Sequence, residues 1–152
     1  MEMVFDRTAA DVEEARKIRD DKIKTFSELT EKEKGILEKG FLGINALNRI
    51  EEGLRNAKER IAEIGYHNIG FESKQWNGGE FFGVDDFERI ISNINLTRNG
   101  FFVKKSTPKT PNALYRYDLL NDIEKIINDF FEVIDDITEN YRQCGAYECG
   151  EG

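Results

Sequence analysis

The segment from Leu114 to Tyr141 constrains the fold more than any other part of the sequence. Apolar residues recur in it at alternating spacings of three and four residues, which places them along one face of an α-helix. They are Leu120, Ile123, Ile127, Phe130, Ile134, Ile137 and Tyr141. A second apolar column widens this face beyond the ~100° stripe that covers a single core. It consists of Leu119, Ile126 and Val133, with Phe131 beside it. The pattern predicts a helix that lies centrally in the protein or packs against a second chain.

Two earlier segments repeat the same skeleton, in which a polar residue is followed by apolar residues at helical spacing. The polar leaders Asn45, Asp85 and Asp118 suit a helix N-cap, because a side-chain oxygen there can accept from unpaired backbone N–H groups. Gly65 fits the left-handed position that ends a helix. We therefore predict three related amphipathic helices, near Asn45–Ile64, Asp85–Leu96 and Leu114–Tyr141.

Residues 1–43 form a group of shorter elements. Thr8 with Asp11 predicts the start of a helix that reaches about Phe26, and Thr30 with Glu33 forms a capping box for a second, short helix. The first helix has a thin apolar face and a charged remainder, which is typical of a solvated helix and also suits packing on a neighbouring subunit. We expect residues 1–43 to be loosely attached helices of a single domain that covers residues 1–152.

The segment Gly65–Gly83 loses the helical period. It contains five glycines and five aromatic residues, and Asn77-Gly78 is a turn signal. We predict an irregular loop rich in aromatic residues and glycine, or a short hairpin, between the helices. Such aromatic residues either pack over the core as a satellite cluster or contact a sugar or a protein partner. Tyr66 and Trp76 are therefore candidates for partner binding.

A basic segment precedes the last predicted helix. Residues 104–112 have the composition of an exposed linker within the domain and contain both prolines, while no acidic residue occurs between Glu88 and Asp118. Lys104, Lys105 and Lys109 are candidate contacts for an acidic neighbour. A solvated loop accounts for them equally well.

Length and charge exclude several classes of protein. A chain of 152 residues fits one domain, and its net charge of −8 disfavours a nucleic-acid binder, which neutralises phosphates with Lys and Arg. No segment approaches the ~20 apolar residues of a membrane span. The opening residues lack the basic and then apolar order of a signal peptide, so we expect synthesis and folding in the cytosol. The fold class that follows is mainly α, a bundle of three to four helices.

The sequence offers no convincing catalytic or metal site. It has one histidine, His67, and lacks Gly-x-Ser-x-Gly, His-Glu-x-x-His and P-loop motifs. Cys144 and Cys149 supply only two of the four ligands that a zinc site usually needs, so free thiols are the favoured interpretation. The adjacent carboxylates at Asp85-Asp86 do not face each other on a helix. We expect no enzyme activity, no cofactor and no metal.

Several short segments, in order and over nearly the whole chain, resemble small virion structural proteins of tailed phages and prophages of Gram-positive bacteria. These segments are Phe5–Val12, Thr30–Glu33, Gly43–Glu51, Trp76, Asp85–Ile90, Asn93–Ile94, Asn121–Ile126 and Tyr141–Glu151. Proteins of this group are described as tail, baseplate or tail-fibre-associated proteins, and the resemblance carries no active site. The chain departs from the group at Glu80–Gly83, where a proline-bearing turn is common, and in its short linker before the last helix.

Two functions from different classes follow. The resemblance implies an assembly module of a phage tail tip, baseplate or tail fibre, which contacts itself and other tail proteins and resides in the virion after assembly. The alternative is an acidic cytosolic regulator or decoy that binds a basic protein. The candidate partner-binding residues are Leu119, Ile126, Val133, Phe131, Tyr141, Trp76, Tyr66, Lys104, Lys105 and Lys109.

Overall fold

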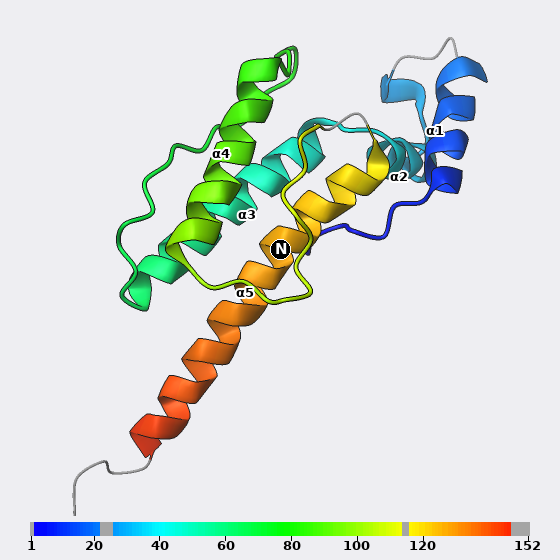
Figure 1. Cartoon of the computed structure of the whole chain (residues 1–152). Coiled ribbons are helices and arrows are strands. Elements are labelled where there is room, and N and C mark those ends of the chain that lie inside the picture. Colours follow the sequence, from blue (N-terminus) through cyan, green and yellow to red (C-terminus); the bar gives the residue numbers. More distant parts are fainter. Residues whose placement is uncertain (1, 22–25, 114–115, 147–152) are drawn as a thin grey trace, which may run out of the picture.

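The computed structural model describes residues 2–21, 26–113 and 116–146, and in this part of the chain the protein is mainly helical, as predicted (Figure 1). Its elements are α1 (Ala9–Asp21), the short 3₁₀ helix η1 (Phe26–Glu28), α2 (Glu31–Gly40), α3 (Ile44–Glu63), α4 (Val84–Gly100) and α5 (Tyr117–Ala146). No strand occurs in the described residues. The segment Gly65–Gly83, here called the middle loop, contains a turn at Gly78-Gly79 and no hairpin.

Local sequence sets several helix ends as expected. The Thr30 backbone N–H donates to the Glu33 carboxylate (2.9 Å), and the Glu33 N–H donates to the Thr30 hydroxyl (3.2 Å), which completes the capping box. Thr8 and Asp11 exchange the same pair of hydrogen bonds at α1. After α3, Gly65 has a φ of +104°, a region that favours glycine, and the Gly65 N–H donates to the Ala62 carbonyl (3.0 Å).

The prediction that Asn45 and Asp85 are N-caps is wrong. The caps of α3 and α4 are Gly43 and Gly83, whose extended backbones come one residue before the first helical turn. Asn45 lies inside α3 and donates to the Glu38 side chain instead. In α4 the Asp86 carboxylate accepts from the Gly83 N–H (3.2 Å), so the carboxylate that reaches back lies inside the helix. Asp118 is not an N-cap either, because α5 begins at Tyr117; it lies in the first turn of α5, where it pairs with Arg116.

The hydrophobic core lies between α3, α4 and α5. Helix α3 packs against both other helices. Most residues of the predicted apolar seams lie in the core, whereas Phe87 of α4, predicted as a core residue, is half-buried and outside the core cluster. The buried core residues include Leu47, Ile50, Leu54, Ala57, Ile61, Ile90, Ile94, Leu120, Ile123, Ile126, Ile127, Phe130 and Ile134. Trp76 and Ile69 of the middle loop, Met3 and Phe101 also belong to it.

Residues 2–40, here called the arm, form a separate layer. Helices α1 and α2 cross so closely at Ala15 and Gly40 that a Cβ built on Gly40 would lie 2.3 Å from the Ala15 Cβ. Within the described residues, neither α1 nor α2 contributes to the core cluster, whereas Met3 does. Residues 2–7, here called the strap, therefore connect the arm to the core more directly than its helices do.

Candidate interaction surface

Helix α5 runs beyond the other helices at its C-terminal end (Figure 1). An ion pair between the Arg60 and Asp135 side chains (2.7 Å) joins it to the last part of α3. Ile134, just before this pair, is the last core residue of the seam at 1% exposure. Past the pair the seam leaves the core, because Ile137 is half-buried and Tyr141 is 68% exposed. The projecting end therefore continues an apolar stripe that the described part of the chain does not cover.

Charge is arranged around this stripe in a particular way. If Ile134, Ile137 and Tyr141 occupy the a and d positions of a heptad, the e and g positions beside them are Thr138 and Asn140, which are uncharged. The acidic residues of the same turns fall on the outward positions; they are Asp135, Asp136 and Glu139. A second helix can approach the stripe without meeting charge at its edges.

Aromatic residues gather near the same end of the protein. The Tyr66 ring meets the Phe101 and Phe102 rings edge-on, with centroids 5.3 and 5.8 Å apart. Phe102 is 56% exposed. An ion pair between Lys104 and Glu132 (2.5 Å) fastens this segment to α5 just before the projecting end, and the hydrogen bond from Lys104 lowers the pKa of Glu132.

The structure divides the predicted partner-binding residues into three groups: exposed, buried and half-buried. Tyr66 and Tyr141 are exposed, as are Lys105 and Lys109. Ile126 and Trp76 are core residues, 0% and 2% exposed, so the second apolar column of α5 is largely covered within the chain. The remaining apolar candidates are half-buried; they are Leu119, Phe131 and Val133.

The basic segment is mostly engaged within the chain. Arg98 donates to the Pro108 carbonyl (2.7 Å), Lys104 pairs with Glu132, and Arg116 pairs with Asp118 (2.6 Å). Arg98, Lys104 and Arg116 therefore have partners within the chain. Lys105 and Lys109 remain exposed.

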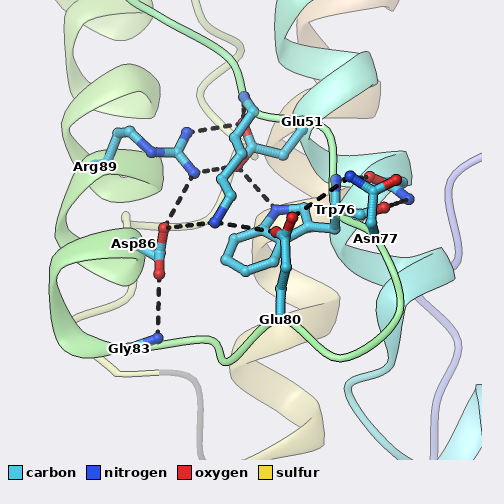
Figure 2. A network of polar contacts seen from close by, with 9 residues as sticks. Glu51, Trp76, Asn77, Glu80, Gly83, Asp86 and Arg89 are labelled. Carbon is cyan, nitrogen blue, oxygen red and sulfur yellow. Dashed lines mark hydrogen bonds and ion pairs between the residues drawn. The ribbon is translucent and has the colours of Figure 1, made fainter.

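A buried carboxylate that the sequence analysis did not identify holds the middle loop. Glu51 of α3 is 1% exposed and accepts from the Arg89 guanidinium, from the Trp76 indole N–H (3.3 Å) and from the Lys74 backbone N–H (3.2 Å) (Figure 2). Asn48, one turn earlier, binds the Trp76 backbone in both directions: its Oδ1 accepts from the N–H (2.7 Å) and its Nδ2 donates to the C=O (3.0 Å).

The same arrangement occurs on α5, where it holds the strap. Glu124 is 0% exposed and accepts from the Arg7 guanidinium (2.6 Å) and the Val4 backbone N–H (2.5 Å), and Arg49 binds both of its oxygens (2.7 and 2.8 Å). Asn121 accepts from the Arg7 N–H (3.2 Å) and donates to the Arg7 C=O (2.8 Å).

The two sites share the sequence Asn-x-Ile-Glu, at 48–51 and at 121–124. In each site the Asn side chain binds both backbone groups of one residue, Trp76 in the first site and Arg7 in the second. The Glu carboxylate accepts from the side chain of that residue and from a backbone N–H two or three residues earlier in the chain. An arginine from another helix completes the pairing of each carboxylate. The repeated skeleton was visible in the sequence, but the segments it would bind were not.

Three cavities are lined by residues of the arm. The largest, about 710 Å³, has mainly apolar walls from α1, α2 and the start of α3, including Ile18, Leu37 and Ile44. A second, of about 630 Å³, separates the strap from α2, and a third, of about 530 Å³, separates α1 from the start of α5. The helices of the arm are therefore incompletely packed on the core.

The described residues contain no group of three or more His, Cys, Asp or Glu side chains placed to hold a metal ion. Cys149 lies outside them, and Cys144 lies on α5 in a part whose side chains are not described. Within the same residues, no helix is both long enough and apolar enough to cross a bilayer. Comparisons with protein-family models, curated proteins and solved structures found no match.

Proposed function

We propose that this protein is a non-catalytic assembly module of a phage or prophage virion, part of the tail tip, baseplate or tail fibre. In this proposal α3, α4 and α5 form a three-helix bundle and the projecting end of α5 joins one copy to the next. The observation that carries it is the continuation of the α5 seam past the core, to Tyr141 at 68% exposure. The sequence resemblance supports the virion assignment.

The charge pattern favours a second copy as the partner of this surface. A net charge of −8 makes most contacts between copies repulsive. The uncharged Thr138 and Asn140 at the edges of the stripe remove that repulsion where two α5 helices would meet. A basic partner would gain more from acidic residues at those edges, and the acidic residues lie on the outward positions instead.

The α5 contact is tested by placing the same charge on its two faces. Tyr141→Lys puts a cation in the stripe, and Glu139→Lys, the matched control, puts it on an outward position. In sedimentation at micromolar concentration we expect an oligomer for the natural sequence and for Glu139→Lys, and a monomer with unchanged circular dichroism for Tyr141→Lys. The proposal is contradicted if the natural sequence is a monomer and does not bind co-expressed tail proteins. Binding to a basic protein instead would support the alternative, an acidic regulator.

The virion assignment is tested separately. Particles are induced from a lysogen that carries the gene and purified on a density gradient. We expect the protein in the tail fraction at a fixed ratio to known tail subunits, and tails that lack it when the gene is deleted. Normal, infectious particles that never contain the protein exclude a virion role.

A further inference from the structure

The strap is bound to α3 and α5 in the manner of a peptide ligand. It has no helix or strand, and its contacts to α5 come from residues more than a hundred positions away in the chain. Asn121 binds both backbone groups of Arg7, and the Arg7 side chain, 1% exposed, meets the buried Glu124 carboxylate. Backbone clamping supplies affinity, and the arginine–carboxylate pair supplies specificity.

An apolar anchor completes this site. Met3 is 7% exposed and lies over Gly53 of α3, in a notch that only glycine leaves open. A Cβ built on Gly53 would lie 2.4 Å from the Met3 Cε and 2.9 Å from Cγ2 of Ile127. A methionine in a notch, an arginine on a buried carboxylate and a clamped backbone together form a site matched to this one sequence.

The rest of the arm adds little to this attachment. Helices α1 and α2 are absent from the described core cluster, and two cavities lie between them and the starts of α3 and α5. The described polar contacts of these helices include the Lys39 pairs with Asp6 (3.4 Å) and Asp11 (3.5 Å) inside the arm, and a hydrogen bond from Asn45 at the start of α3 to the exposed Glu38 side chain. Only residues 41–43 lead from the arm into α3, and both Phe41 and Gly43 have extended backbone angles there.

We propose that the strap site on α3 and α5 is an interface between copies, which accepts the strap of a neighbouring copy in place of its own. Exchange preserves every strap contact, since the neighbour carries the same Met3 and Arg7, and changes only the path of residues 41–43. Such exchange of an identical element is a low-cost route to association. The middle loop uses the same Asn-x-Ile-Glu chemistry but connects directly to α3 and α4, so it stays within its own chain.

This inference rests on the proposed function only for the presence of closely spaced copies. Exchange and the α5 contact are distinguishable, because Tyr141→Lys removes the α5 contact and leaves the strap site intact. If exchange fails while the natural sequence still associates through α5, the proposed function stands and this inference does not.

Photo-cross-linking of the full chain tests the exchange. Phe5 is 40% exposed, and the Lys125 ammonium of α5 lies 5.6 Å from its ring centroid, so p-benzoylphenylalanine in place of Phe5 reports which α5 helix the strap contacts. The photo-labelled chain in light isotopes is unfolded and refolded with an equal amount of the natural chain in heavy isotopes. After irradiation, mass spectrometry separates strap–α5 peptides into light–light and light–heavy pairs.

With complete exchange, the light–heavy pairs reach the same yield as the light–light pairs. Arg7→Leu in the photo-labelled chain should remove both kinds, whereas Arg16→Leu, which changes an exposed arginine of the same arm, should leave both unchanged. The proposal is overturned if light–heavy pairs stay at the level found when chains are mixed after irradiation. An absence of strap–α5 pairs of either kind overturns it as well.

Discussion

Glu124 joins three segments of the protein, because this buried carboxylate of α5 receives arginines from the strap and from α3. Removing one partner of a buried ion pair typically costs about 3–5 kcal/mol, since the remaining charge loses its compensation. We expect Glu124→Ala to lower the free energy of unfolding by this amount in urea titrations. Glu88→Ala, at an exposed position of α4, should change it little, and equal effects of the two variants would contradict the role given to Glu124.

Two glycines within helices give opposite expectations for the same substitution. In an open helical position, Gly→Ala usually stabilises by roughly 0.5–1 kcal/mol, and nothing lies within 4 Å of a Cβ built on Gly35 of α2. At Gly53 the new methyl group would displace Met3 and press on Ile127. Thermal unfolding should therefore show a higher midpoint for Gly35→Ala and a lower one for Gly53→Ala. A gain at Gly53 would mean that Met3 does not occupy the notch.

At the scale of elements, the sequence predicted the helices well because their apolar periodicity reflects burial directly. The seams from Leu47 to Ile61 and from Leu120 to Ile134 are core residues. The caps of α3 and α4 were missed, because Gly43 and Gly83 cap through an extended backbone and offer no side-chain oxygen to recognise. Helix α4 continues to Gly100 with Thr97 buried, its hydroxyl donating to the Asn93 carbonyl (2.9 Å).

The candidate surface was predictable only in part, for a physical reason. Apolar periodicity indicates that a residue packs against an apolar surface. It does not indicate whether that surface belongs to the same chain or to a partner. Ile126 and Tyr141 were therefore equivalent in the sequence, yet one is 0% and the other 68% exposed. Likewise, Glu51 and Glu124 stand inside apolar seams, which signals buried partners, but Arg89, Arg49 and Arg7 come from distant parts of the chain.

The Lys104–Glu132 pair predicts a pH dependence for the attachment of the aromatic segment to α5. The hydrogen bond from Lys104 lowers the pKa of Glu132 in the folded protein. The contribution of this ion pair to the free energy of unfolding is therefore present above the ordinary pKa range of glutamate. It is lost as pH falls through the lowered folded-state pKa of Glu132. Glu132→Gln should be less stable than the natural sequence at neutral pH and equal to it in acid, measured by urea unfolding. A difference that does not change with pH would exclude this pair as its source.

At the scale of the whole molecule, the arm and the core should open independently. Segments with few buried apolar contacts exchange their amide hydrogens through small local openings, whereas core helices exchange near the global unfolding limit. We expect α1 and α2 to exchange well before α3 and the first half of α5 in hydrogen-exchange mass spectrometry. Arg7→Leu should accelerate the arm further without changing α3, and uniform protection of all five α-helices would contradict this division.

The middle loop also gives the protein an optical property. Trp76 is the single tryptophan of the chain, it is 2% exposed, and its indole N–H is held by Glu51. Intrinsic tryptophan fluorescence therefore reports on one event, the release of the middle loop from α3, and shifts to the red when that loop meets water. Strap exchange takes place at the strap site on α3 and α5, preserves the contacts of that site and leaves the middle loop in place, so we expect it to leave this emission unchanged. A fluorescence trace and a sedimentation trace of the same sample then follow two different processes.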